Sequence, residues 1–431
     1  MQNPDEHKKI TGFLKFLFYL KLLIEVPVRY LPRVKDLGGI RNYCRFLFRA
    51  LKFTFLFSRH KLLKVGDNLY KLDFYMPAYP SRAFFEAMDA KLMHVPPRPI
   101  SVVFSITKAC TYKCGHCYQK LDRGADLDGD TMLRTAAEMR DFGICAFAVE
   151  GGEPLLKFSR LLKLLKVLEG AEIWVNSTGA GYTREMLAEL KKAGVFGIMT
   201  SMHSVMPGEH DAFTGIENSW QLSCDFIRDC KRAGLCTGFN TVLEEDAIIA
   251  GGIDGIMELA KKLDCDFIQL IHAKSSGCWL GRKADPQKNA EAVKIAQRAH
   301  EFYNSRAAKD YPVLTAQVFE EQETMLGCTA GGIDRFYINA NGEIQPCEFL
   351  NFSFGNVGKE SFSAIYERMR LFFPIPRTDW PCCSKAAAIN ELIMKHGLKT
   401  TPVPWPLTEE LFNGHETGKA TPIYEKLGIY Q

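Results

Sequence analysis

Short apolar runs alternate with amphipathic stretches along the chain from about residue 98 onwards. The run 101–106 is rich in β-branched residues and predicts a strand, whereas 130–142 has its apolar residues at helical spacing. The same order recurs, which predicts further strands at 146–149, 172–175, 196–200, 237–242 and 267–271 and further helices at 158–168, 184–193, 221–232 and 253–263. Six strand–helix units in succession predict an α/β fold with a parallel sheet or a barrel covered by helices, and six units, fewer than the eight of a closed barrel, would make a partial (β/α)6 barrel. In such folds, functional residues lie at the carboxyl ends of the strands.

The pattern changes near Tyr311. Two short apolar runs, 336–338 and 342–344, are separated by an Asn/Gly turn and predict a β-hairpin. The chain after Thr400 is rich in proline and aromatic residues, which favours extended chain packed on the rest. The predicted architecture is a partial TIM-type barrel with an N-terminal helical segment and a small C-terminal extension. Its expected parts are a basic helical segment at 1–65, a connecting hairpin and helix at 66–98, the barrel at 99–315, the hairpin extension at 316–400 and the tail at 401–431.

Composition narrows the class of protein. Hydrophobic residues make up 47% of the chain and charged residues 24%, which is ordinary for a globular protein and excludes wholesale disorder or a polytopic membrane protein. The 14 cysteines are too sparse for a small disulfide scaffold, so either most are buried thiols or some of them hold metal.

Basic residues are concentrated at the N-terminus. Residues 1–65 contain 14 Lys and Arg against 4 Asp and Glu, although the whole chain has a net charge of only +4. The remainder is therefore net acidic, and we expect no nucleic acid as a partner.

Two helices are predicted in this basic segment, at 12–24 and 41–57. Basic residues beside bulky apolar ones indicate helices that lie on an anionic membrane surface. The alternative is a helical pair packed on the barrel with solvated arginines. Charged residues interrupt the first apolar run, which is too short to span a bilayer, and no convincing signal cleavage site follows it. We therefore expect a cytoplasmic protein, peripheral on the inner face of the membrane. The second helix carries its basic residues on one face: Arg41, Arg45, Arg49 and Lys52.

Three cysteines follow the first predicted barrel strand within eight residues, Cys110, Cys114 and Cys117. Thiolates are soft ligands that suit iron–sulfur clusters or zinc. Three ligands on one loop leave one metal vertex open, as a catalytic metal requires. The alternative is a structural zinc site completed by His116 or by a distant residue.

The C-x3-C-x2-C spacing at a strand end resembles the radical S-adenosylmethionine (radical SAM) superfamily. The resemblance implies that these three cysteines hold a [4Fe-4S] cluster whose fourth iron chelates SAM, and it places His116 near the adenine. It further implies reductive cleavage of SAM to a 5′-deoxyadenosyl radical, which abstracts hydrogen from an unactivated C–H bond. A ferredoxin- or flavodoxin-like protein would supply the electron.

A second match follows the next strand, in Glu150-Gly151-Gly152-Glu153-Pro154. It resembles the GGEP motif of the family, which contacts the amino group of SAM. The two glycines allow close approach of a ligand, and Glu153 can accept from an ammonium group. Further strand ends carry polar residues that match SAM-contacting positions of the family loosely, although each could simply cap a helix: Asn176, Thr178, Ser201, His203 and Asn240.

A second set of cysteines lies in the predicted extension. Cys328, Gly342 and Cys347 have the spacing that opens the SPASM extension, which carries auxiliary clusters in many peptide-modifying radical SAM enzymes. Only the adjacent pair Cys382-Cys383 follows, which resembles the truncated "twitch" form with one auxiliary [4Fe-4S] cluster. The resemblance implies that Cys328, Cys347 and one or both of Cys382 and Cys383 are its ligands. The alternative is a group of unmetallated thiols around a hairpin.

The remaining cysteines carry less information. Cys278, after the sixth strand, could donate a hydrogen atom in catalysis, ligate the auxiliary cluster or be a buried thiol, and the last is the simplest interpretation. The others lie in apolar or helical stretches and are predicted to be core residues: Cys44, Cys145, Cys224, Cys230, Cys236 and Cys265.

The motifs do not specify the substrate. The N-terminal segment favours a membrane lipid or isoprenoid-like molecule, whereas the SPASM-like cysteines favour a ribosomally made peptide or protein. A third hypothesis is a non-catalytic iron–sulfur electron carrier, against which the GGEP motif argues, since a carrier needs no SAM site.

Overall fold

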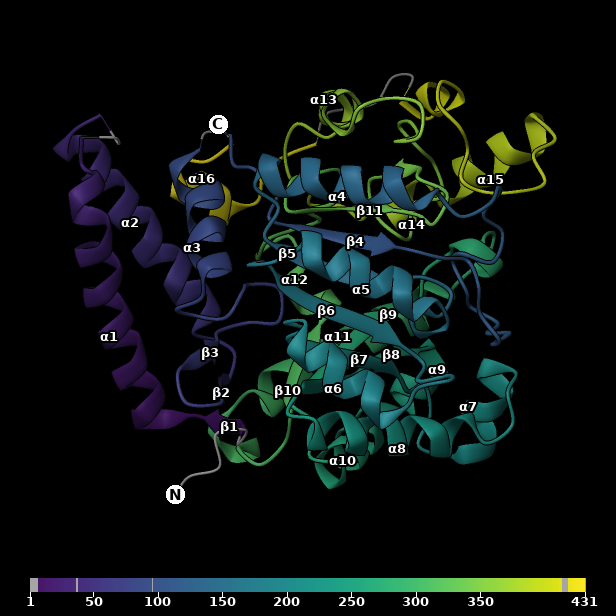
Figure 1. The fold of residues 1–431 in the computed structure, drawn as a ribbon, viewed down its shortest axis with the longest axis horizontal. Helices are drawn as coiled ribbons and strands as arrows, with labels where there is room; N and C mark the ends of the chain where they lie inside the picture. Colours follow the sequence, from purple (N-terminus) through teal and green to yellow (C-terminus); the bar gives the residue numbers. More distant parts are fainter. Residues whose placement is uncertain (1–6, 36–37, 95, 413–417, 431) are drawn as a thin grey trace.

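A nine-stranded sheet forms the centre of the computed structural model, which describes residues 7–35, 38–94, 96–412 and 418–430 (Figure 1). The strand order is β10-β9-β8-β7-β6-β5-β4-β11-β12, and neighbouring strands are parallel except for the β11–β12 pair. The predicted parallel α/β fold is therefore confirmed. The strands are β4 (Ser101–Ser105), β5 (Ala146–Glu150), β6 (Glu172–Ser177), β7 (Gly197–Ser201), β8 (Cys236–Leu243), β9 (Phe267–His272), β10 (Val313–Ala316), β11 (Arg335–Ile338) and β12 (Ile344–Gln345).

Helices return the chain from one strand to the next. Helix α4 shows the local reasons: the Asp128 carboxylate accepts from the backbone N–H of Thr131 at its start, and Gly143 ends it in the left-handed region. Its buried side chains Met132, Ala136 and Met139 lie on one face toward the sheet. The connecting helices are α4 (Gly129–Phe142), α5 (Phe158–Val167), α6 (Arg184–Lys192), α7 (Pro207–Thr214), α8 (Ser219–Arg232), α9 (Glu245–Ile249), α10 (Gly252–Lys262), α11 (Pro286–Tyr303) and α12 (Gln317–Glu320).

The sheet is larger than the six strands predicted. Strand β10 is a seventh barrel strand, parallel to β9, and the predicted hairpin continues the same sheet because β11 pairs in parallel with β4. Strand β10 is only four residues long and buried throughout, so it has no alternating pattern to mark it. The predicted division at 315/316 stays a prediction, and strands on both sides of it belong to one sheet.

The N-terminal segment forms a layer beside the barrel. In Figure 1, helix α1 lies at the outer edge of the molecule and α2 lies between α1 and α3. Arg49 and Lys52 of α2 donate to the carbonyls of Leu427, Gly428 and Lys426 at the C-terminal end of α16, so part of the predicted basic face of this helix is engaged within the protein. The layer contains β1 (His7–Ile10), α1 (Gly12–Tyr30), α2 (Ile40–Phe57), β2 (Leu62–Val65), β3 (Leu69–Lys71), α3 (Arg82–Met88) and α16 (Pro422–Leu427).

Two further predictions need correction. Cys44 is exposed on α2, because the buried face of that helix, with Tyr43 and Phe46, points the other way; the other five cysteines predicted to be core residues are buried. The described part of the tail is not extended throughout: Thr401 and Val403 form β-bridges, and a 3-10 turn and α16 follow. Between β12 and the tail lie α13 (Phe362–Phe372), α14 (Pro381–Ser384) and α15 (Ala386–Lys395).

Candidate active site

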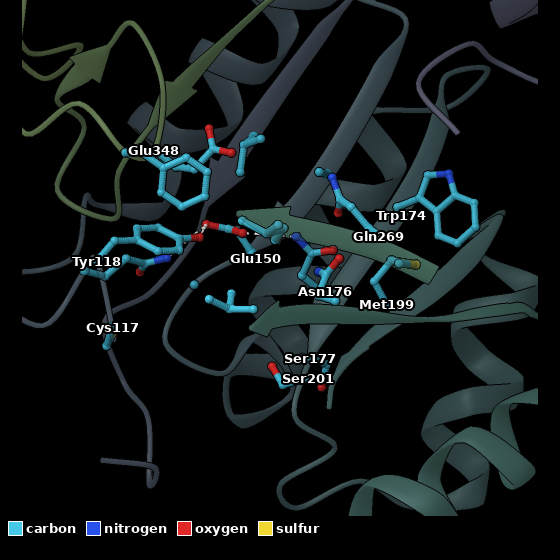
Figure 2. A pocket seen from close by; sticks show the side chains of 18 of the residues that line it. Cys117, Tyr118, Glu150, Trp174, Asn176, Ser177, Met199, Ser201, Gln269 and Glu348 are labelled. Atoms are coloured by element: carbon cyan, nitrogen blue, oxygen red, sulfur yellow. Dashed lines mark hydrogen bonds between the residues drawn. The ribbon is translucent and has the colours of Figure 1, made fainter. Parts of the chain in front are cut away.

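A cavity of about 460 Å³ runs along the inside of the barrel from the carboxyl ends of the strands. Figure 2 shows Cys117, Tyr118 and Glu348 at one end of it and Trp174 and Met199 toward the other. Most of the residues predicted from the sequence to bind cluster or SAM line this cavity: Cys110, Cys114, His116, Cys117, Gly151, Gly152, Asn176, Thr178, Ser201, His203 and Asn240. Glu153, Pro154 and Cys278 do not line it.

The cysteine loop is fixed by backbone hydrogen bonds to remote parts of the chain. The N–H of Lys113 donates to Thr214 O (2.9 Å) and that of Gly115 to Phe213 O (3.2 Å), both in α7. Burial raises the pKa of the Cys114 thiol to about 12, and the neighbouring Cys117 and Cys110 add to the effect. The three thiols thus lie close enough to oppose one another's ionisation, and a bound iron or zinc would relieve that repulsion.

The spacing of these thiols does not favour a zinc knuckle. Four sulfurs around one zinc ion lie roughly 3.8 Å apart, given a Zn–S bond of about 2.3 Å. Among the described residues, two groups have three potential ligand atoms within 4.8 Å of one another, and neither group includes a cysteine of this loop. His116 points into an aromatic group instead, with its ring 4.7 Å from Phe213 and 4.8 Å from His203, and burial lowers its pKa to about 4.

Neither of those two other groups has the chemistry of a metal site. In the group of His60, His300 and Glu320, Nδ1 of His300 accepts from the backbone N–H of Ala316, so the proton of the neutral ring is on Nε2, the atom that faces Glu320. In the group of His7, Cys236 and Asp266, the ammonium of Lys231 already pairs with the carboxylate at 2.9 Å.

Both glycines line the cavity, and their contact with SAM stays a prediction. They also allow a close approach within the chain itself: a Cβ on Gly151 would lie 2.5 Å from Thr107 O, and one on Gly152 would lie 2.5 Å from Ala109 O. The N–H of Gly152 donates to Thr107 O and that of Glu153 to Ala109 O, both at 2.7 Å. The turn after β5 therefore holds the segment that leads into Cys110.

Glu153 is also a residue that positions its neighbours. Its carboxylate is fully buried and accepts from Ser177 Oγ (2.7 Å), Thr178 N (2.7 Å) and Thr178 Oγ1 (2.6 Å), and from Leu155 N (3.0 Å). These contacts join the end of β5 to the end of β6 and leave little capacity for an external ammonium group. Pro154 is buried at the start of the following 3-10 turn.

Glu150 is a buried carboxylate in the cavity wall, and the sequence motif alone assigned it no role. Glu150, the last residue of β5, accepts from the hydroxyl of Tyr118, from Gln119 Nε2 (2.9 Å) and from Asn176 Nδ2 (3.1 Å) (Figure 2). Burial raises its pKa to about 7, although these donors oppose the shift. The sequence signal for this site residue is an acidic side chain at the end of a barrel strand. The hydrogen-bond donors that surround the carboxylate come from two other segments.

Cys278 lies beside the first cysteine loop. Its backbone N–H donates to Cys117 O at 3.1 Å, and a thiolate there would raise the pKa of Cys117. The preceding Gly277 has a φ of +54° and packs so closely that a Cβ would lie 2.2 Å from the Cα of Tyr118. Cys278 is partly buried, and its role in catalysis stays a prediction.

The second set of cysteines lies on separate segments of the extension. Cys328, Cys347 and Cys382 are buried in one apolar cluster, whereas Cys383 is exposed. Backbone bonds from Cys328 N to Arg377 O (2.8 Å) and from Gly331 N to Pro346 O (2.9 Å) hold these segments together.

The same extension contributes to the barrel cavity. Glu348 and Arg335 both line it, and the Cys347 thiol donates to Glu348 Oε2 at 3.0 Å. The cavity wall is thus built by the barrel and by the extension that follows it.

Comparison with known proteins decides the family. Residues 104–245 match the radical SAM superfamily, and residues 328–386 match SPASM, an iron–sulfur cluster-binding domain. The protein is a radical SAM enzyme with a SPASM domain.

Relatives of this radical SAM/SPASM enzyme are distant. It is 24% identical to the PqqA peptide cyclase of Bradyrhizobium diazoefficiens over 303 residues, which is 66% of this chain and 78% of that protein. It is 24% identical to the PqqA peptide cyclase of Xanthomonas axonopodis pv. citri over 302 residues, 67% of this chain and 79% of that protein. SuiB of Streptococcus suis bound to precursor peptide SuiA has a similar fold, with a TM-score of 0.51 at 16% identity over 66% of this chain and 67% of that one. The structure of anSMEcpe with bound AdoMet gives a TM-score of 0.50 at 15% identity, covering 62% and 80%.

The family uses a [4Fe-4S] cluster and SAM in the barrel and iron–sulfur clusters in the SPASM domain. The barrel cavity fits a polar cosubstrate, because several polar atoms in its wall are buried without a hydrogen-bond partner in the part of the chain that the structure describes. They are Nδ1 of His116, Nε2 of His203 and Oδ1 of Asn240.

The second set of cysteines fits an anionic cluster, because a buried cation faces it. Lys274 follows β9, is 4% exposed, and its ammonium has no hydrogen-bond partner among the described residues. It lies 3.6 Å from the ring centre of Trp380. The hydrogen bond between the two thiols raises the pKa of Cys382 and lowers that of Cys383 to about 6, and the Lys274 charge favours the thiolate form of both. A buried, unpaired cation requires a compensating negative charge, which a thiolate-bound iron–sulfur cluster supplies.

Proposed function

We propose that this radical SAM/SPASM enzyme modifies a ribosomally made peptide or protein by abstracting hydrogen from one of its unactivated C–H bonds. The observation that carries the proposal is the joint wall of the cavity, which is lined both by Glu348 of the SPASM domain and by the barrel residues predicted to bind SAM. Relatives with the same two parts are named for peptides, as PqqA peptide cyclase and as SuiB with precursor peptide SuiA. A ferredoxin- or flavodoxin-like protein would supply electrons.

In this proposal, Cys110, Cys114 and Cys117 hold the [4Fe-4S] cluster, and Nε2 of His203 and Oδ1 of Asn240 meet polar groups of SAM. The cluster with SAM supplies a 5′-deoxyadenosyl radical. The chain contributes alignment of the reacting C–H bond and exclusion of water. Phe74 and Trp174 line the cavity far from the cysteine loop, and Glu172 accepts from Lys71 Nζ (2.5 Å) and Ala78 N (2.6 Å), which ties the N-terminal layer to the barrel.

Glu150 is the group in the cavity best placed to accept or release a proton. Its pKa of about 7 allows both protonation states near neutral pH. The donors Tyr118, Gln119 and Asn176 orient the carboxylate toward the space where substrate would lie.

For the auxiliary site, we propose one [4Fe-4S] cluster on Cys328, Cys347 and the Cys382-Cys383 pair. Cys328 and Cys382 lie close enough for each thiolate to affect the other. Lys274 faces Cys328 as well as the pair, which gives the cluster a buried counter-charge.

The sequence also suggested an electron carrier and an enzyme that acts on a lipid. The electron-carrier hypothesis is wrong, since the chain belongs to an enzyme family. A lipid or isoprenoid-like substrate has support only from the N-terminal segment, and the relatives favour a peptide instead.

Among the described residues, none of the helices has the length and hydropathy to cross a bilayer. We propose a peripheral position on the inner face of the membrane, through residues 1–65.

Isotope transfer distinguishes the substrate classes. The anaerobically reconstituted enzyme is incubated with SAM, a reductant and either perdeuterated peptides or perdeuterated lipids from the host cell. Hydrogen abstraction from a substrate carbon transfers deuterium into 5′-deoxyadenosine, which mass spectrometry detects. We expect deuterium from the peptide fraction; transfer from the lipid fraction alone would refute the proposed substrate class. A variant with all three loop cysteines changed to alanine is the control.

A further inference from the structure

Helix α1 presents a continuous apolar stripe to solvent. Phe13 is 71% exposed, Ile24 60% and Val28 64%, although each of these side chains is large and apolar. Single exposed apolar residues are normal on protein surfaces, but a contiguous row on one helix face marks an interaction surface. The stripe consists of Phe13, Leu14, Phe16, Leu17, Leu20, Ile24, Val28 and Leu31.

Packing on the opposite side holds this stripe outward. Phe18, Leu22, Val26 and Tyr30 recur every fourth residue and are all buried. Phe18 packs against Tyr70 and Tyr79, and Tyr30 packs against Phe46 of α2. In Figure 1, α1 lies at the outer edge of the molecule, and no other element covers its outer side. The helix therefore cannot turn its stripe inward without losing its buried contacts.

The charges on α1 and α2 are mostly basic. Helices α1 and α2 contain seven Lys and Arg residues but one acidic residue, Glu25. Arg49 and Lys52 are engaged at the end of α16, while Lys21, Arg29, Arg41 and Arg45 are exposed. A partner for this face must therefore accept bulky apolar side chains and carry negative charge around them.

We propose that α1 lies flat in the interface of an anionic lipid bilayer, with the stripe immersed among the acyl chains and the basic residues at the headgroups. Both requirements meet in such a surface. A second copy of the chain would satisfy the apolar stripe but would bring two basic faces together. The inference rests on the membrane part of the proposed function and is independent of the peptide part.

Vesicle flotation tests the proposal with the full chain. Vesicles of phosphatidylcholine alone are compared with vesicles that also contain phosphatidylglycerol, at low and high salt. The wild type should float with the anionic vesicles, and less so at high salt, because salt screens the basic residues. Leu17→Glu together with Ile24→Glu should lower the partition coefficient by about tenfold or more, since both charges would enter the acyl region.

A matched control separates the stripe from a general charge effect. Phe302→Glu with Leu371→Glu adds the same charge at exposed apolar residues of α11 and α13 and should leave flotation unchanged. Circular dichroism and 5′-deoxyadenosine formation should be unchanged in both double variants, and this activity readout keeps failure of docking distinct from failure of the proposed chemistry. Flotation that is absent in the wild type, or equal in the two double variants, would overturn the proposal. A concentration-dependent dimer abolished by Leu17→Glu/Ile24→Glu would assign the stripe to self-association instead.

Discussion

The two cysteine sites of this enzyme are built in opposite ways. The SAM-site thiols lie within one loop, partly exposed at the mouth of the cavity and fixed by backbone bonds to the turn after β5 and to α7. The auxiliary thiols come from three separate segments, and three of the four are buried in the apolar core. The difference indicates that the loop thiols contribute little to the packed core, whereas the buried cysteines of the auxiliary set are part of it.

The largest effect should come from removing the loop thiols. We expect no detectable 5′-deoxyadenosine from the variant with Cys110, Cys114 and Cys117 all changed to alanine, because SAM would lose its cluster. Its far-UV circular dichroism and unfolding midpoint should stay near those of the wild type, since apolar burial in the sheet holds the barrel. Undiminished 5′-deoxyadenosine would remove the basis for the proposed site.

The substitution Gly152→Ala, which adds one methyl group to the turn after β5, should have the next largest effect. The Cβ of Gly152→Ala would meet the carbonyl oxygen of Ala109 at 2.5 Å, so the segment before Cys110 must move. A displacement of about 1 Å in an active site can lower the rate by about 100-fold. Gly208→Ala, in α7 with open space around its Cβ, is the control. Equal rates of SAM cleavage in the two variants would show that the close packing is not required.

Changing Cys328 and Cys347 together to alanine tests the auxiliary site. Well-reconstituted wild type should bind about eight irons as two [4Fe-4S] clusters, and this variant about four. SAM cleavage without substrate should persist, because the loop cluster is separate. The variant should also unfold at a lower temperature, since two buried side chains are shortened. An iron content near four in the wild type would leave the auxiliary cysteines as structural thiols.

The smallest expected effect concerns the cation that faces the auxiliary cysteines. Lys274→Met removes a buried positive charge, so the auxiliary cluster should become harder to reduce, with a potential lower by tens of millivolts. Lys274→Arg keeps the charge and should preserve most of the potential. Redox titration followed by electron paramagnetic resonance measures both clusters, and the loop cluster serves as the internal reference. A shift of both clusters by the same amount would contradict a local role.

The sequence alone predicted the parts whose signal lies within a few neighbouring residues. Local spacing marks the six barrel strands, the loop cysteines, the glycine turn and the hairpin cysteines. The structure has the six strands as β4–β9, and the loop cysteines line the cavity. Strand β10 was missed because four buried residues have no period. The exposed Cys44 was misassigned because apolar neighbours do not reveal which face of a helix is covered.

Tertiary structure alone decided which atoms meet. The sequence determined that Gly151 and Gly152 permit a close approach, but only the fold showed that Thr107–Ala109 makes it. It placed Glu150 directly after a predicted strand, but the three donors that surround its carboxylate come from the cysteine loop and from β6. Likewise, it predicted basic apolar helices at the N-terminus, but packing chose which side of α1 faces outward and engaged Arg49 and Lys52 at α16. The reason is that periodicity and spacing are set by bonded geometry over a few residues, whereas burial, pKa and pairing depend on segments far apart in the chain.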